Sequence, residues 1–206
     1  MSARDEILRK VRSAIAGTTP VTTPVQPPPG ATAPDLVAHF AERVADYRAV
    51  VVRTDPGGLA AAVADSLPAG VRVVVPPGLG DLVPGAVIDA GLTAVELDAV
   101  DAVVTRCRVG IAETGTIVLD HEPDQGRRAI TLVPDLHVCI VDAGQVVADV
   151  PDAFAHLDPR RPLTWISGPS ATSDIELDRV EGVHGPRVLW VIVVEPAAPR
   201  PGEAAG

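Results

Sequence analysis

Residues 100–119 read VDAVVTRCRVGIAETGTIVL, and this stretch joins two apolar runs through a polar loop. The runs Val100–Val104 and Thr116–Leu119 are short and rich in β-branched residues, which predicts buried strands. The loop between them holds one carboxylate, Glu113, together with hydroxyl residues and Gly115. Glycine permits a positive φ or a close approach to a ligand, and successive N–H groups in such a turn can bind an anion. The stretch therefore predicts two strands with a candidate ligand-binding loop between them.

Outward from this unit, short apolar runs alternate with helical patterns, which favours an α/β layer fold. Helices are expected at residues 36–44, 58–67 and 150–157. Further strands are expected at Ala49–Val52, Val71–Val75, Ala129–Val133, Val138–Val141, Trp165–Ile166 and Val188–Val194. Several of the later strands are too close together for helical crossovers, so they must be antiparallel. We therefore predict a mixed, twisted sheet flanked by helices.

The chain divides into four segments by composition. Residues 1–16 form a predicted amphipathic helical arm capped by Ser2, and residues 17–34 form a proline-rich linker. The globular α/β domain is expected at residues 35–195, followed by a disordered tail at 196–206.

Composition excludes several classes of function. The net charge of −10 disfavours nucleic-acid binding, although Arg127-Arg128 and Arg160-Arg161 are local basic patches. Lys10 is the only lysine, which excludes a Walker-type phosphate loop and disfavours Schiff-base chemistry. No apolar run reaches the roughly 20 residues of a membrane span. With two cysteines and no apolar signal region at the N-terminus, we expect a cytoplasmic protein.

Two further polar loops each adjoin an apolar run. Ser167–Glu176 is rich in hydroxyls, which favours helix capping or anion binding, and Gly182–Arg187 contains His184. A histidine in a turn is either structural or able to donate to an oxyanion and exchange a proton. We predict that the three loops converge on one pocket above the sheet. The expected ligand- or anion-binding residues are Thr114, Gly115, Thr116, Ser167, Gly168, Ser170, Thr172, Asp174, Glu176 and Gly185.

Three side-chain sets have competing interpretations. Glu113 is either a solvated loop carboxylate, paired or not with Arg106 or Arg108, or a nucleophile, general base or hydroxyl acceptor. With His184 it is the candidate catalytic residue. His137 and Cys139 alternate along a predicted strand, but their spacing to Cys107 and His184 matches no zinc signature, so no metal site is expected. Asp174 and Glu176 would share a face only in an extended segment.

Three motifs in this order resemble the LUD-domain family of lactate utilization proteins. They are Ala112–Thr116 with the run Ile117–Leu119, Ser167–Ser170 through Asp174–Glu176, and Gly182–Pro186. The likeness spans roughly residues 35 to 195. It implies a fold similar to ribose-phosphate isomerases, glucosamine-phosphate deaminases and CoA transferases.

The resemblance also implies a role in the oxidation of L-lactate to pyruvate beside iron–sulfur partner proteins. Because iron–sulfur clusters are commonly held by four cysteines and this chain has two, we expect the clusters in the partners and no cofactor bound by this chain. The favoured expectation is an accessory subunit that is not catalytic alone, with a small carboxylate or phosphate as its candidate ligand. The alternative is an enzyme. CoA transferases of the related fold use a glutamate nucleophile, and by this resemblance Glu113 would carry out acyl transfer. A cyclo-ligase-like activity is a third option, which is disfavoured because the chain lacks a lysine to bind a phosphate.

Overall fold

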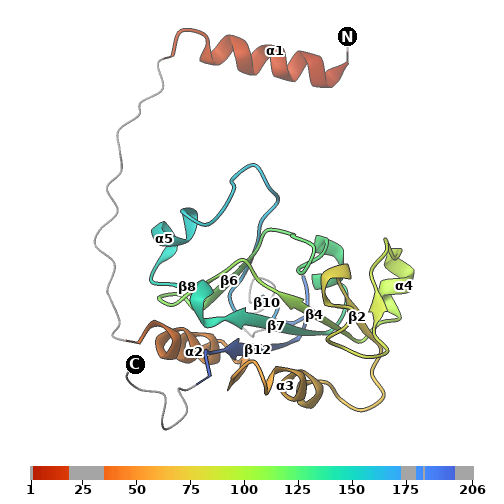
Figure 1. Ribbon diagram of the computed structural model, residues 1–206. Coiled ribbons are helices and arrows are strands. Elements are labelled where there is room, and N and C mark those ends of the chain that lie inside the picture. The colour runs from red at the N-terminus through yellow and green to blue at the C-terminus, as the bar shows by residue number, and fades with distance from the viewer. Residues whose placement is uncertain (1, 19–34, 173–179, 183, 198–206) are drawn as a thin grey trace.

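The computed structural model describes residues 2–18, 35–172, 180–182 and 184–197 (Figure 1). Most of the predicted linker, most of the predicted tail, and the candidate residues Asp174 and Glu176 lie outside the described residues. For Thr172 only the backbone is described. No helix within the described ranges is long and apolar enough to cross a membrane.

The central layer is a six-stranded sheet in which every neighbouring pair is parallel. Its order is β1-β12-β7-β4-β2-β3, with the bounds Val50–Thr54, Val188–Val194, Leu136–Asp142, Ala102–Arg106, Val73–Val75 and Val87–Ile88. Parallel sheets are usually covered on both faces, so their strands are apolar almost throughout rather than alternating. The valine-rich runs of β2, β7 and β12 have this character.

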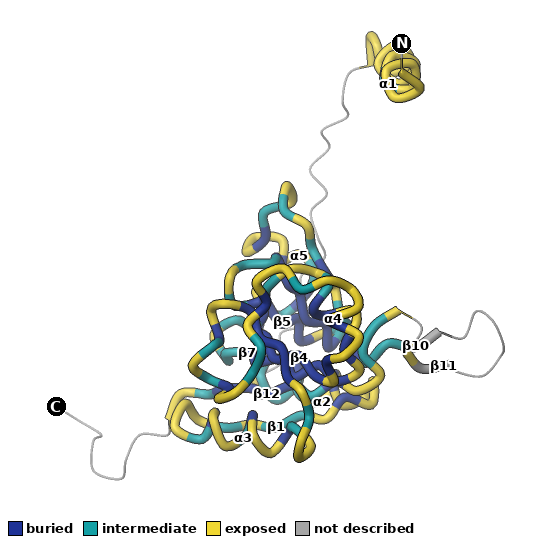
Figure 2. Tube along the Cα trace, turned by 90° about the vertical axis from the view of Figure 1, so that its right-hand side faces the viewer, coloured by how far each residue is buried: buried dark blue, intermediate teal, exposed yellow. Residues whose placement is uncertain are grey.

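Side chains alternate between two separate cores on the two faces of this sheet. Cys139 and Val191 pack with Phe40 of α2 (Leu36–Asp46), whereas Ile140 and Ile192 pack with Val63 of α3 (Leu59–Ser66). The two amphipathic helices therefore cover opposite faces. Figure 2 shows the buried residues gathered along β4, β5 and β7.

A second sheet with the order β8-β5-β6-β9 covers the α2 side of the first. Its strands are Val146–Val147, Val109–Ile111, Thr116–Leu119 and Thr164–Ile166. β6 is antiparallel to both β5 and β9, and β8 is parallel to β5. The α/β class with mixed strand directions is confirmed, and the antiparallel pairs that close spacing predicted lie in this second sheet. Its outer face packs on Ala153 of α5 (Val150–Phe154).

The remaining elements are small. They are α1 (Ala3–Ile15), α4 (Ala94–Asp98), the antiparallel pair β10 (Ala171–Thr172) and β11 (Val180–Glu181), and three short 3-10 turns. In α1 the Ser2 hydroxyl accepts from the Asp5 N–H, so the predicted cap is confirmed. None of the residues of α1 is buried (Figure 2).

Two local predictions fail. Residues 129–133 were expected to form a strand, which is wrong: Arg128–Thr131 is a 3-10 turn, η2. Its apolar composition reflects burial of Ile130 beside the sheet, and periodicity alone does not separate such short runs from strands. Residues 109–111 were expected to lie in the loop between the two predicted strands, which is also wrong: they form β5, with Gly110 at its centre. A Cβ there would lie 3.1 Å from the Phe40 ring, so the glycine admits the close packing of α2.

Candidate functional site

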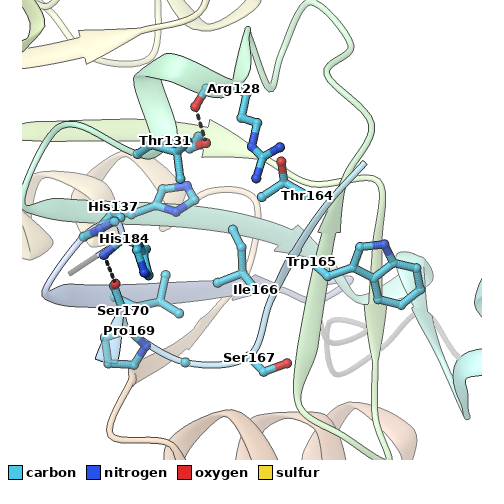
Figure 3. Close-up of a pocket in the computed structure, with 15 residues that line it drawn as sticks. Arg128, Thr131, His137, Thr164, Trp165, Ile166, Ser167, Pro169, Ser170 and His184 are labelled. Carbon is cyan, nitrogen blue, oxygen red and sulfur yellow. Dashed lines mark hydrogen bonds between the residues drawn. The ribbon is translucent and has the colours of Figure 1, made fainter. Parts of the chain in front are cut away.

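A cavity of about 310 Å³ opens between η2, β9 and the starts of β7 and β12 (Figure 3). It is lined by Arg128, Thr131, Leu132, His137, Thr164, Trp165, Ile166, Ser167, Gly168, Pro169, Ser170, His184, Gly185, Pro186 and Leu189. His137 and Leu189 are each the second residue of their strand, so this is the amino-terminal edge of the parallel sheet. Ligands in open α/β sheets more often bind at the carboxyl edge. The position of this cavity therefore could not be derived from the fold class.

Strand β9 forms one wall through its alternation. Thr164 and Ile166 face the cavity, whereas the Trp165 ring turns away and lies 5.9 Å from the Phe154 ring (Figure 3). The Thr164 hydroxyl is 3.0 Å from His121 Nε2, and His121 Nδ1 is 2.8 Å from the Gly126 carbonyl. The carbonyl can only accept, so Nδ1 carries a proton and donates to it. This contact holds the Thr164 hydroxyl against the His121 ring.

The loop after β9 is held to the loop before β12. The His184 N–H donates to the Ser170 hydroxyl at 3.0 Å, and the Ser170 N–H donates to the Pro186 carbonyl at 2.8 Å. Gly168 has a φ of 84° and a Cβ there would lie 2.6 Å from Tyr47 Cβ, so only glycine fits. Ser170 lines the cavity, and its hydroxyl accepts from His184 but donates to no other described residue.

Two consecutive arginines have opposite surroundings. Arg127 forms a two-pronged ion pair with Asp89, at 2.6 and 2.9 Å, and also donates to the Leu92 carbonyl. The hydrogen bonds from Arg127 lower the pKa of Asp89 below its ordinary value despite the burial of that carboxylate. Arg128 instead extends toward Thr164 at the mouth of the cavity (Figure 3). No side-chain hydrogen bond or ion pair of Arg128 is formed within the described part of the chain.

The floor of the cavity is a buried polar group on β7. His137 Nε2 lies 2.8 Å from the Thr105 hydroxyl, and Thr105 also contacts Cys139. Cys139 and Cys107 are both buried with free thiols. Hydrogen bonding with Cys139, together with burial, raises the pKa of the Cys107 thiol well above its ordinary value, and the same interaction lowers the pKa of Cys139. Among the described residues no three histidine, cysteine or acidic side chains are placed to hold a metal ion.

The Glu113 loop lies behind the cavity rather than in it. Glu113 is exposed, is not part of the lining, and its N–H donates to the Ala148 carbonyl at 3.0 Å. Arg106 pairs with Asp142 and Arg108 donates to the His156 carbonyl, so neither arginine binds Glu113. This geometry is that of a solvated loop carboxylate.

A chain of hydroxyls connects this loop with the cavity edge. Thr114 Oγ1 lies 2.7 Å from Thr116 Oγ1, which lies 2.8 Å from Ser167 Oγ. Gly115 has a φ of 59°, and a Cβ there would be 2.6 Å from the backbone of Arg43. The glycine therefore serves the packing of the loop on α2.

The structure thus brings together part of the predicted site. The second and third loops meet at the cavity, contributing Ser167, Gly168, Ser170, His184 and Gly185. Thr114, Gly115 and Thr116 do not line the cavity, and Thr116 is connected to it through its hydrogen bond with Ser167. The roles assigned to these residues, and to Glu113, stay predictions. Sequence reasoning missed Arg128 as a site residue, because the Arg127-Arg128 pair indicated only a basic patch and does not reveal which guanidinium has a protein partner.

Known proteins resemble the chain over most of its length. Residues 89–194 match the LUD domain family. A lactate utilization protein C from Deinococcus radiodurans is 45% identical over 93% of this chain and 95% of its own length. The chain belongs to the LUD domain family. A second lactate utilization protein C, from Geobacillus thermodenitrificans, is 29% identical over 79% of this chain and 70% of its own length.

A solved structure of the same kind supports the LUD fold. A crystal structure of a DUF162 family protein from Deinococcus radiodurans is 41% identical, with a TM-score of 0.66. The similarity covers 77% of this chain and 96% of the crystallised chain. The LUD domain and its α/β architecture are therefore shared with an experimentally determined protein.

Proposed function

We propose that this chain is an accessory subunit of an L-lactate utilization system, in which iron–sulfur partner proteins carry the electrons from lactate toward pyruvate. The similarity to lactate utilization protein C along nearly the whole of both chains is the observation that carries the proposal. A cytoplasmic location is part of the same proposal.

The cysteines of the chain support the assignment of the iron–sulfur clusters to the partner proteins. Iron–sulfur clusters are commonly held by four thiolates, and this chain has only Cys107 and Cys139. Both are buried in the apolar core between the sheets, and the Cys107 thiol is stabilised in its protonated form. A cluster in this system therefore belongs to a partner, and the polar cavity is the part of this chain that would meet a small ligand.

Deletion of the gene in the organism that encodes this chain tests the physiological role. Growth on L-lactate should be abolished, whereas growth on pyruvate, which enters metabolism after the oxidation, should be unchanged. Reintroduction of the gene should restore growth on lactate. Undiminished growth of the deletion strain on L-lactate would contradict the role.

Reconstitution tests the accessory character. The purified chain alone should not reduce a redox dye with L-lactate, and the same chain mixed with its iron–sulfur partner proteins should support that reduction. Lactate-dependent dye reduction by the chain alone would show that it is the oxidising enzyme itself.

A further inference from the structure

We propose that the cavity binds a compact monocarboxylate with an oxygen on its α-carbon, an α-hydroxy or α-keto acid, and that the Arg128 guanidinium holds the carboxylate. The choice of this acid class rests on the proposed function. The assignment of Arg128 as the anion-binding group rests on the geometry of the cavity alone.

The charge distribution singles out Arg128. The chain has a net charge of −10, so its average field repels an anion and capture requires a local cation. Arg128 is the only lysine or arginine among the described residues that line the cavity. Its planar fork matches a carboxylate in a two-pronged contact, and no protein carboxylate in the described ranges occupies it.

The other groups of the cavity suit the rest of such an acid. Ser170 keeps a hydroxyl proton to donate, and the exposed His184 ring lies beside it, across the cavity from Arg128 (Figure 3). These two groups are able to bind an α-oxygen. The apolar side chains of Leu132, Ile166 and Leu189 line the same space and suit a short alkyl group.

The backbone of the loops favours a carboxylate over a phosphate. Phosphate sites commonly use several free backbone N–H groups. Here the N–H groups of Ser170, Gly182 and His184 all donate to hydrogen bonds between the loops. Arg128 is the single guanidinium among the described lining residues, and one guanidinium is matched to a singly charged anion.

The size and access of the cavity agree with a small ligand. Its volume of about 310 Å³ lies at the lower end of small-molecule sites, which start near 300 Å³. A second hollow of about 430 Å³ shares Arg128, Leu132, His184 and Gly185 with it. Arg128 and His184 therefore stand where the two spaces join, at the position where an incoming acid would first meet the protein.

Calorimetric titration of the purified full chain tests the proposal. L-lactate and pyruvate should bind, whereas lactamide, which lacks the negative charge, should not. Arg128→Gln should raise the Kd for both acids at least about tenfold, the loss expected for one hydrogen-bonded charged contact. Arg128→Lys, which keeps the charge without the fork, should give an intermediate Kd.

A matched variant controls for net charge. Arg160→Gln removes the same charge from an exposed residue that pairs with Asp158 outside the cavity, and it should leave the Kd unchanged. Because the Arg128 side chain makes no described protein contact, Arg128→Gln should also keep the wild-type urea unfolding curve.

Three results overturn the proposal. They are failure of the wild-type chain to bind either acid, equal affinity of wild type and Arg128→Gln, and binding of inorganic phosphate in place of both acids. The gene deletion separates this outcome from that of the proposed function. Loss of growth on lactate without acid binding removes the cavity assignment alone, and Arg128-dependent acid binding in a chain dispensable for growth removes the accessory role alone.

Discussion

The Thr114–Thr116 loop and the Ser167–Ser170 loop have similar sequences but different surroundings. Each contains hydroxyl residues around a glycine with positive φ, and each glycine packs on the end of α2, Gly115 on Arg43 and Gly168 on Tyr47. In the first loop the hydroxyls bind one another and Ser167. In the second, Ser170 keeps a free proton at a cavity. What packs against a loop, rather than its composition, decides whether its polar groups are available to a ligand.

The two adjacent arginines at the start of η2 show the same dependence on surroundings for charged groups. Arg127 fills its fork with Asp89 and stabilises the fold, whereas the fork of Arg128 is open at the cavity. Substitutions in the closed member of each pair should therefore affect stability, and those in the open member should affect binding.

The largest effect is expected for Gly115→Ala. The added methyl group meets the Arg43 backbone at 2.6 Å, in a left-handed conformation that itself costs about 1–2 kcal/mol for other residues. Together these should lower the free energy of unfolding in urea by roughly 3 kcal/mol. Gly85→Ala is the matched control, because Gly85 has a φ of 81° and no atom within 4 Å of the new Cβ. Equal losses in the two variants would show that the loop does not depend on its contact with α2.

The Asp89→Ala variant should lower the free energy of unfolding by about 2 kcal/mol, less than for a fully buried pair because Arg127 is partly exposed. The carboxylate also accepts from the N–H groups of Gly91 and Leu92, which lose their partner. Arg128→Ala should stay within about 0.5 kcal/mol of wild type. If Arg128→Ala lowered the free energy of unfolding as much as Asp89→Ala, Arg128 would contribute to stability like Arg127, and the difference between the two arginines would be refuted.

The contribution of Asp89 should depend on pH in a defined direction. Its pKa is lower in the folded protein than its ordinary value of 3.8, so the unfolded chain binds the proton more readily. The stabilisation is therefore complete well above pH 3.8 and is lost as the pH falls through the lowered pKa. Urea unfolding of wild type and Asp89→Ala at several pH values should show a difference that shrinks in acid. A difference that grows in acid would contradict the assignment.

A smaller effect is expected for Thr116→Val, which removes the central hydroxyl of the Thr114–Thr116–Ser167 chain. The loss should be about 1 kcal/mol, because two partly buried hydroxyls lose a partner. Thr114→Val breaks only one of these bonds and should cost less. Titration with lactate should give the wild-type Kd in both variants, and a large change would place the hydroxyl chain in the site rather than behind it.

The smallest effect is expected for Glu113→Gln. Because Glu113 is exposed and makes no described side-chain contact, the free energy of unfolding should change by less than about 0.5 kcal/mol. Lactate-dependent dye reduction by the reconstituted system should also be unchanged. Loss of that activity in a folded variant would favour the acyl-transfer alternative, in which this carboxylate is the nucleophile.

Local signals in the sequence predicted most of the elements. The Leu36, Phe40 and Val44 stripe corresponds to α2, and the uninterrupted run at Val188–Val194 corresponds to β12. Hydrophobic periodicity succeeds there because each element buries one face or both faces along its whole length. It fails at η2, where a short apolar run is buried by neighbours that are remote in sequence.

The sequence by itself determined the α/β class, the family, and three candidate loops of which two meet at the cavity, since periodicity, capping and motif order are local properties of the chain. Only the tertiary structure decided that the parallel strands and the antiparallel strands form separate sheets. Among the described residues it also placed Glu113 in solvent, left the Arg128 side chain without a hydrogen bond or ion pair, and paired Arg127 with Asp89. The physical reason is that the neighbours of a charged or polar side chain decide whether it is paired or exposed, and those neighbours come from segments tens of residues apart.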